Sequence, residues 1–327
     1  MVLKNVKYAI QKIPFFMVLA YIAADRIRGF QLQLGHLETN SGTPHQKFSV
    51  SQSVDYIGNV FNAYKKYGKV EQFYGLAAEV GPGDNAGVAL LMRQDGCEQV
   101  DLIDRFYSRR SFEQQARIYA ALAQQYGLDE FRAADSWNEQ ELLGINWKIG
   151  QPAEVYFEKC AQERGPVYDF IVSCAVLEHL YNPLKALQEM VSCLKPGGRL
   201  LHQIDFRDHG MFSRAHHELT FLSIPTAIYP LMVYHSGRPN RILIHRYREL
   251  LNSLKINTLI DYSFLITSLV RVGQLDYPQR FEEIDPDLLM QSVNFVKAHR
   301  HEFCREFNSV DSQDLAVSGV FLAVTKK

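Results

Sequence analysis

The residues best suited to bind a ligand lie in a short glycine-rich turn, EVGPGDN, at residues 79–85. An apolar run precedes the turn and a helix-like pattern follows it. A strand, a glycine turn and a helix in this order present backbone N–H groups to a nucleotide at the start of the helix. About 20 residues further on, a second apolar run ends at Asp104, whose carboxylate can accept hydrogen bonds from both hydroxyls of a ribose. The spacing therefore predicts a nucleoside-binding site.

The charges around the turn distinguish between two kinds of ligand. Turns that bind a dinucleotide have the pattern Gly-x-Gly-x-x-Gly, which lets a pyrophosphate approach the start of the helix. Here Gly81 and Gly83 are followed by Asp84, which places a negative charge where the phosphates would lie. Glu79 adds a second negative charge just before the turn. These acids favour a ligand that carries an ammonium and a sulfonium group.

Strand-like and helix-like segments alternate along the chain from this turn onward. Short apolar runs predict five strands, at residues 77–80, 99–104, 145–149, 168–176 and 199–206. Helical patterns lie between them and continue in the tail, at residues 85–96, 111–127, 183–194, 246–254 and about 286–307. Two further strands, at residues 256–263 and 315–327, would close the sheet at one edge. The order predicts an α/β fold with a Rossmann-like, doubly wound, seven-stranded sheet.

Three stretches of the chain resemble the class I S-adenosylmethionine-dependent methyltransferases. EVGPGDN is similar to the first motif of that family, and VDLID at residues 100–104 is similar to its second strand with the ribose-binding acid. YDFIVSCAVLEHLYNPLKALQEMVSCLKPGGRLL, residues 168–201, is similar to its fourth strand, the helix that follows, and the turn into the fifth strand. The resemblance extends over about residues 76–206.

The resemblance implies which residues would hold S-adenosylmethionine. Gly81 and Gly83 would let the backbone approach the methionine part of the cofactor, and Asp104 would bind its ribose. Asn85 stands where the family has a third glycine, and we expect it to tolerate left-handed backbone. Gln151 would meet the edge of the adenine. The contacts near the cofactor's ammonium group would come from Glu79, Ser173 and Cys174.

Methyl transfer is a direct displacement, so the protein must align the acceptor behind the sulfonium methyl group and exclude water. If the acceptor is a hydroxyl group, a base helps to remove its proton, and histidine is best matched to that task near neutral pH. His209 follows the fifth predicted strand, at the edge of the sheet where substrates arrive, and is preferred to His179 after the fourth. A loop histidine without a chemical role is the alternative for His209.

The segment from Asp208 to about residue 245 is too long for a plain connection in such a sheet. We interpret it as a cap over the substrate pocket, with a solvated basic loop as the alternative. The residues of this segment that would hold a polar or anionic acceptor are Asp208, Arg238, Asn240 and Arg241. Its histidines lack the spacing of a metal site, so none is predicted.

The composition and the N-terminus limit the remaining possibilities. A net charge of −1 over 327 residues argues against a nucleic-acid partner. The five cysteines are scattered without a CxxC pair, which fits a reducing, cytoplasmic location. Residues 1–47 are predicted to form a helical arm whose apolar stretch, residues 13–24, is shorter than a bilayer crossing. We expect this arm to act as a lid, with a homodimer contact as the second possibility and peripheral membrane contact as an unlikely third.

These features predict a methyltransferase domain over residues 48–327. Its parts would be a cofactor-binding core at about residues 70–207, the cap at about 208–245, and C-terminal strands and a helix at 246–327. The enzyme would methylate the oxygen of a small-molecule acceptor, such as a natural product or sugar hydroxyl. The alternatives are an NAD-dependent oxidoreductase or epimerase on a similar sheet, and a module that binds the cofactor without catalysis.

Overall fold

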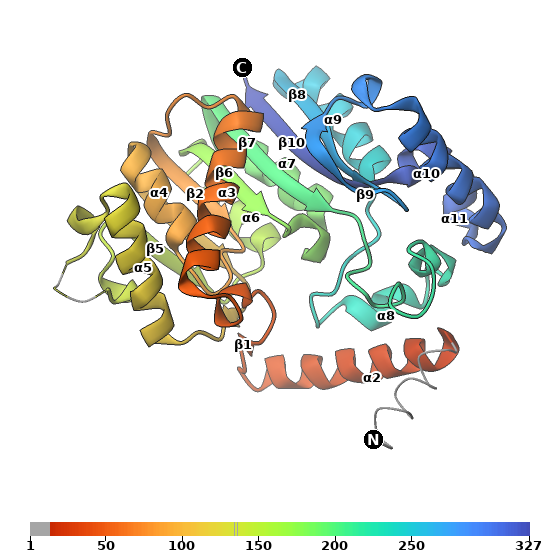
Figure 1. The fold of residues 1–327 in the computed structure, drawn as a ribbon, viewed down its shortest axis with the longest axis horizontal. Coiled ribbons are helices and arrows are strands. Elements are labelled where there is room, and N and C mark those ends of the chain that lie inside the picture. The colour runs from red at the N-terminus through yellow and green to blue at the C-terminus, as the bar shows by residue number, and fades with distance from the viewer. Residues whose placement is uncertain (1–13, 134, 136) are drawn as a thin grey trace.

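A computed structural model describes residues 14–133, 135 and 137–327, so the first 13 residues of the predicted arm lie outside the described part. Its centre is an eight-stranded sheet with the order β5-β3-β2-β6-β7-β10-β8-β9 (Figure 1). The strands are β2 (Gly75–Val80), β3 (Cys97–Asp104), β5 (Ile145–Ile149), β6 (Tyr168–Cys174), β7 (Leu194–Asp205), β8 (Ile260–Leu269), β9 (Gly273–Gln279) and β10 (Val317–Lys326). The first five are mutually parallel, and β10 lies antiparallel between β7 and β8.

Helices cover both faces of the sheet. One face carries α3 (Val50–Gly68), α4 (Gly87–Asp95) and α5 (Phe112–Tyr126); the other carries α6 (Ala153–Glu163), α7 (Pro183–Cys193) and α9 (Ile244–Thr258). Side chains of β3 alternate between the two cores: Val100 and Leu102 pack on the α3 side and Ile103 on the α6 side. Because such strands are buried on both faces, they read as continuous apolar runs in the sequence.

The predicted fold class is confirmed, and the differences lie in the tail. The sheet has an eighth strand, β9, which the sequence analysis missed because it is a largely exposed edge strand that contains Pro278. Helix α9 runs through Thr258, so residues 256–258 end a helix and do not begin a strand. The long helix expected at residues 286–307 is divided into α10 (Pro286–His299) and α11 (Arg305–Asn308).

The arm and the segment after β7 meet on one side of the sheet. Helix α2 (Pro14–Gln33) lies against the short helix α8 (Tyr229–Val233) (Figure 1). The Tyr21 hydroxyl donates a hydrogen bond to the Met211 carbonyl at 2.9 Å, and the buried Asp25 carboxylate accepts one from the Ser236 N–H at 2.8 Å. Strand β1 (Glu38–Thr39) then pairs with β4 (Tyr107–Ser108), next to the end of β3.

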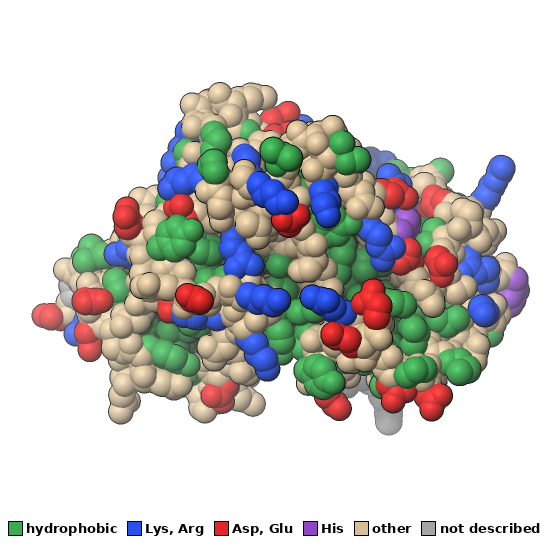
Figure 2. All heavy atoms as spheres, turned by 90° about the horizontal axis from the view of Figure 1, so that it is seen from above, with side chains coloured by type: hydrophobic (Ala, Val, Ile, Leu, Met, Phe, Trp, Pro, Cys, Tyr) green, Lys and Arg blue, Asp and Glu red, His purple; other side chains and the backbone are tan. Residues whose placement is uncertain are grey.

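The outer side of α2 is apolar and exposed. Its exposed large hydrophobic side chains are Phe15, Phe16, Leu19, Ile27 and Phe30, and Leu34 follows directly after the helix. None of the helices within the described residues is long and apolar enough to cross a membrane. On the face of the molecule turned away from α2, basic and acidic side chains lie interspersed (Figure 2).

Candidate active site

A cavity of about 540 Å³ opens at the carboxyl ends of the parallel strands, where the strand order reverses between β2 and β6. Ligands of doubly wound sheets bind at this position. Six residues that the sequence singled out for ligand binding or catalysis line the cavity together: Gly81, Gly83, Asp104, His179, His209 and Arg238. The arm contributes Tyr21, Thr39, Ser41 and Gly42 to the same wall, and the segment after β7 contributes Met211, Arg214, Arg238 and others.

The glycine turn is fixed by its protein neighbours as well as by its backbone. Gly81 and Gly83 both have a φ of +68°, which disfavours any residue with a Cβ. A Cβ on Gly81 would lie 2.5 Å from the Val176 side chain, and one on Gly83 would lie 2.6 Å from the Gly42 carbonyl. Arg110, which the sequence analysis missed, donates to the Gly83 carbonyl at 3.0 Å. The turn therefore brings backbone to the cavity wall.

The expectation for Asn85 is wrong, because this residue does not adopt a positive φ. Its side chain oxygen instead accepts a hydrogen bond from the Gly87 N–H at 2.6 Å, where α4 begins, and its side chain nitrogen donates to Gln115. The two left-handed positions of the turn are both occupied by glycines, so the third position is free to satisfy the N–H groups at the start of the helix.

A second, smaller cavity of about 50 Å³ adjoins the first, since both share Gly81. Its wall includes His45, Tyr56, Glu79 and Cys174. Burial raises the pKa of Glu79 to about 8, and its Oε2 has no hydrogen-bond partner among the described residues. Burial also lowers the pKa of His45 to about 4. A buried carboxylate of this kind is stabilised by a cationic partner, so an ammonium group fits the small cavity.

His45 and Tyr56 escaped the sequence analysis for identifiable reasons. His45 lies in the stretch NSGTPHQK, which looks like a plain turn-rich connection, and Tyr56 lies on a helix without a motif. Only the position of His45 just before a capped helix, whose Ser49 accepts from the Gln52 N–H, marks it as part of an ordered segment.

Asp104 ends β3 with its carboxylate at the main cavity. Its Oδ1 accepts a hydrogen bond from the Phe106 N–H at 2.9 Å. Burial raises the pKa of Asp104 to about 6, although that N–H and the nearby Arg110 lower it. Among its remaining lone pairs the carboxylate can accept the two hydroxyls of a ribose, as the sequence predicts.

Three other predicted cofactor contacts have different surroundings. Gln151 is exposed and lines neither cavity, because the chain turns at Gly150 (φ +98°) and Pro152 and Ala153 occupy the wall instead. Ser173 is fully buried and paired with Nδ1 of His202 at 2.7 Å. Cys174 lines the small cavity only, and burial raises the pKa of its thiol to about 12. The sequence predicted correctly that these residues lie near the ends of strands, but it did not predict where their side chains point.

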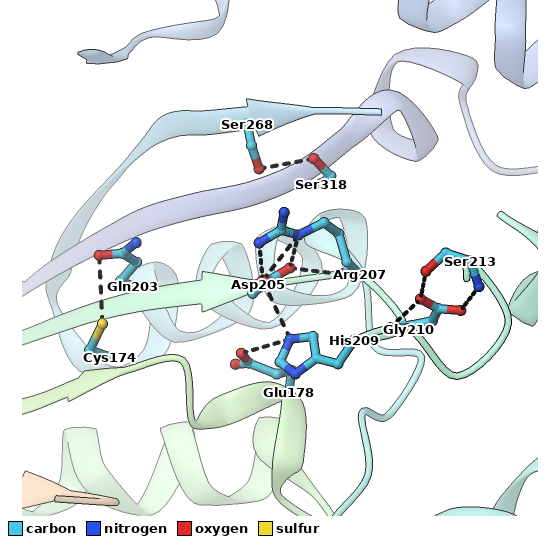
Figure 3. A network of polar contacts seen from close by, with 11 residues as sticks. Cys174, Glu178, Gln203, Asp205, Arg207, His209, Gly210, Ser213, Ser268 and Ser318 are labelled. Atoms are coloured by element: carbon cyan, nitrogen blue, oxygen red, sulfur yellow. Dashed lines mark hydrogen bonds and ion pairs between the residues drawn. The ribbon is translucent and has the colours of Figure 1, made fainter. Parts of the chain in front are cut away.

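At the opposite end of the main cavity, His209 lies between two carboxylates (Figure 3). Its Nε2 is 3.4 Å from Oδ2 of Asp205 and 3.7 Å from Oε1 of Glu178. The ring of His179 packs edge-on against that of His209, with 4.8 Å between their centroids. Burial and the neighbouring His209 lower the pKa of His179 to about 4, whereas burial raises the pKa of Glu178 well above its usual range.

The predicted acceptor contacts divide into one that lines the cavity and three that do not. Arg238 lines it, with its guanidinium 4.8 Å above the Tyr21 ring. Asp208 is buried, and its carboxylate is bonded within its own loop. It accepts hydrogen bonds from the N–H groups of Gly210, Phe212 and Ser213 and from the Ser213 hydroxyl.

Asn240 donates to the carbonyls of Leu177 and Leu180, and Arg241 donates to the Ile224 carbonyl and pairs with Glu306 at 2.8 Å. Asp208, Asn240 and Arg241 therefore hold the cap in place, which corrects the expectation that they contact the acceptor. Arg214, which the sequence analysis missed, lines the cavity in their stead.

Comparison with known proteins bears on the chemistry of this site. The sequence matches the family model of a methyltransferase domain over residues 78–251, more than half of the chain. Among proteins with curated descriptions, none matches.

Matches among solved structures include YcgJ of Bacillus subtilis (14% identity, TM-score 0.41, covering 83% of this chain and 99% of that one). Phosphoethanolamine N-methyltransferase 2 of Haemonchus contortus, in complex with phosphomonomethylethanolamine and S-adenosylhomocysteine, also matches (14% identity, TM-score 0.41, covering 88% of this chain and 59% of that one). A third match is an S-adenosylmethionine-dependent methyltransferase of Mesorhizobium loti (10% identity, TM-score 0.39, covering 85% of this chain and 100% of that one).

Proposed function

The chain belongs to the methyltransferase-domain family, and from this premise we propose that it methylates a hydroxyl group of a small anionic molecule. Family membership makes the protein an enzyme that uses S-adenosylmethionine, and it decides against the oxidoreductase and the non-catalytic module. The identity of the acceptor and the atom that is methylated are the proposed parts.

The cavity residues fit the cofactor. Glu79 would face the cofactor's ammonium in the small cavity, the turn at Gly81 would lie beside its methionine part, and Asp104 would accept the ribose hydroxyls. The orphaned Oε2 of Glu79 supports this placement, because a buried carboxylate without a partner is stabilised by a cation. When bound, the cofactor supplies the electrophilic methyl group, and the surrounding chain orients it and excludes water.

The observation that carries the assignment to a hydroxyl is the position of His209. Its ring lies on the cavity wall, and its Nε2 faces Asp205 and Glu178. An oxygen acceptor must lose its proton as the new bond forms, whereas a neutral amine can attack with its lone pair and lose a proton afterwards. A histidine beside two carboxylates on the cavity wall is therefore suited to accept the proton of a hydroxyl group.

Two arginines support an anionic acceptor. Arg214 and Arg238 line the cavity and both face Tyr21. Arg238 donates only a long hydrogen bond, 3.4 Å, to the Met232 carbonyl, and neither arginine forms an ion pair within the described residues. Asp208 also faces Tyr21, but its carboxylate is saturated by its own loop. A carboxylate or phosphate on the acceptor would therefore meet two guanidinium groups that have no carboxylate partner among the described residues.

The proposal is tested by following transfer of labelled methyl groups to matched pairs of hydroxy acids or phosphorylated alcohols and their neutral analogues. We expect transfer to the anionic member of a pair, at oxygen. Arg238→Gln should raise KM about 10–100-fold with little change in kcat, because one hydrogen bond to a charged group contributes about 1.5–3 kcal/mol. The surface variant Arg246→Gln, which removes a partner of Glu249, serves as the control. Methylation at nitrogen, or equal use of neutral analogues, would show the proposal to be wrong.

We propose that the arm closes the cavity, because Tyr21 of α2 forms part of its wall. The chain should be shortened to begin at residue 36, which removes α2 but keeps Ser41 and Gly42 beside the glycine turn. Turnover is expected to fall by about 10²-fold, as for a misplaced substrate, while binding of S-adenosylhomocysteine persists. Removal of residues 1–13 alone is the control.

Two other results would assign the exposed apolar side of α2 to a different role. A change from a dimer in the intact protein to a monomer in the shortened protein would support a homodimer contact. Loss of binding to anionic vesicles on shortening would support membrane contact. Full turnover with unchanged mass and no vesicle binding by the intact chain would exclude all three roles.

A further inference from the structure

We infer that Glu178, His179 and His209 together bind one divalent transition-metal ion at the acceptor end of the cavity. One ligand atom from each of the three residues lies within 4.8 Å of the other two. Atoms that share such an ion are roughly 3–4 Å apart, because metal–ligand bonds are about 2.0–2.2 Å long. Small side-chain rotations would therefore bring the three groups around one ion. The sequence did not predict this site, since the histidines lie on two separate loops.

The buried Glu178 carboxylate is the observation that points to a cation. Glu178 is 2% exposed, and neither of its oxygens has a hydrogen-bond partner among the described residues. Figure 3 shows its carboxylate directed at the His209 ring, at a distance of 3.7 Å that is too long for a hydrogen bond. Nδ1 of His179 is likewise buried without a partner. Buried carboxylates are stable when they are paired or coordinate a metal, and a cation between these groups would satisfy both.

The fold holds the three ligands from two adjacent strands. Glu178 and His179 lie on a single helical turn, Leu177–His179, directly after β6, and His209 follows the end of β7. Asn240 of the cap fixes the turn, because its side chain donates to the carbonyls of Leu177 and Leu180 and its N–H donates to that of Glu178 at 2.6 Å. His209 has a φ of +49°, a left-handed conformation that a non-glycine residue adopts only when its surroundings impose it.

The other charged groups at this site do not compete for the ion. Asp205 also faces Nε2 of His209, but its carboxylate is already bound by Arg207 through Nε at 2.8 Å and Nη2 at 2.5 Å. Its contact with His209 is made through Nε2, the same nitrogen that faces Glu178, so an ion bound at Nε2 would replace this contact while Arg207 keeps Asp205 in place.

Two imidazoles and one carboxylate favour ions such as Mn²⁺, Fe²⁺, Co²⁺ or Zn²⁺ and leave positions open for substrate. The catalytic part of this inference rests on the proposed hydroxyl methylation; the binding part does not. An acceptor hydroxyl bound to the ion would lose its proton to solvent more readily, because the ion lowers its pKa. The oxygen would then form its bond to the methyl carbon as the sulfur–carbon bond breaks, which leaves neutral S-adenosylhomocysteine. His209 would act on the hydroxyl through the ion.

A second group, His217, His299 and Glu302, provides a matched comparison. Its members already have hydrogen-bond partners: Nε2 of His217 lies 2.9 Å from Glu302, and Nδ1 of His299 lies 2.9 Å from the Phe295 carbonyl. Glu302 is also mostly solvated, with its side chain 38% exposed. Glu302→Gln therefore serves as the control for metal-ion binding by histidine and glutamate side chains outside the cavity.

The test is metal binding by the full chain after treatment with a chelator. Calorimetry with Zn²⁺ and the visible absorption of added Co²⁺ should show one tight site in the wild type and in Glu302→Gln. Glu178→Gln, His179→Ala and His209→Ala should each bind at least about 10–100-fold more weakly, the loss seen even for residues that only orient a ligand. Glu178→Gln conserves shape, and Zn²⁺ should raise the Tm of the wild type but not of this variant.

The outcomes separate this inference from the proposed function. Absence of a tight site, or equal binding by the wild type and Glu178→Gln, would overturn the inference and leave His209 to remove the proton directly. A tight site lost in Glu178→Gln would support the inference even if methyl transfer went to nitrogen, which would overturn the proposed function alone. Turnover on a hydroxyl acceptor that falls after chelation and returns with Mn²⁺, Co²⁺ or Zn²⁺ would support both.

Discussion

Replacing His209 with alanine is expected to lower turnover on the true acceptor by about 10²–10⁴-fold, the contribution typical of proton transfer by a positioned side chain. His209 lines the main cavity but not the small cavity that contains Glu79. The affinity for S-adenosylhomocysteine should therefore change by less than about twofold. The measurement is kcat on a hydroxyl acceptor together with calorimetry of cofactor binding.

The control for this prediction is His301→Ala, which removes a largely exposed histidine far along the chain and should leave turnover unchanged. Asp205→Asn provides an intermediate case, because it removes a carboxylate 3.4 Å from Nε2 of His209 but keeps the ring. Its effect should fall on kcat and be smaller than that of His209→Ala. Unchanged turnover in His209→Ala would instead assign the role to His179, or to an acceptor that needs no proton removal.

The sequence predicts the cofactor end of the site because the information there is local. Gly81, Gly83 and Asp104 are each marked by their place directly after an apolar strand, and strand ends in a parallel sheet meet at one edge. The central strands β2, β3 and β6 are largely buried, which makes their apolar runs easy to recognise. Position along the chain was therefore enough to bring these residues to one cavity.

The acceptor end depends on contacts that no local pattern records. An asparagine at position 240 could bind an acceptor or hold the turn after β6, and the sequence does not distinguish these roles. Only the folded cap shows that its side chain donates to the carbonyls of Leu177 and Leu180. The orphaned carboxylate of Glu178 is equally invisible in sequence, because the His209 ring that it faces belongs to a different loop, after β7. Residue type indicated the chemistry, but tertiary packing decided which side chains reach the cavity.

The errors in the tail have another physical cause. Strand β9 is an edge strand with exposed polar residues, so it lacks the alternation that marks a half-buried strand. Helix α9 ends at a left-handed Leu259 (φ +52°) and not at a glycine, so the usual signal for the end of a helix is missing.

Replacing Asp104 with alanine is expected to weaken binding of S-adenosylhomocysteine by about 10²–10³-fold. The carboxylate spends one bond on the Phe106 N–H and faces the cavity, where two ribose hydroxyls would donate to it. Hydrogen bonds to a charged group contribute about 1.5–3 kcal/mol each. Calorimetry measures the loss, Asp104→Asn should be intermediate because it keeps one acceptor oxygen, and the exposed Asp276→Asn on β9 is the control. Equal affinity in wild type and Asp104→Ala would place the ribose elsewhere.

The pH dependence of the same binding reports on Glu79. Burial raises the pKa of Glu79 to about 8, so near neutral pH the free protein holds this carboxyl mostly protonated. A cofactor ammonium beside it favours the ionised form, and binding must therefore release a proton. Affinity should consequently rise with pH between about 6.5 and 7.5, by at most tenfold per unit for one linked proton, while the ammonium itself stays largely charged. Glu79→Gln should bind more weakly and with a flat profile. A wild-type profile without slope, or a slope that survives in Glu79→Gln, would show that the ammonium does not lie against this carboxylate.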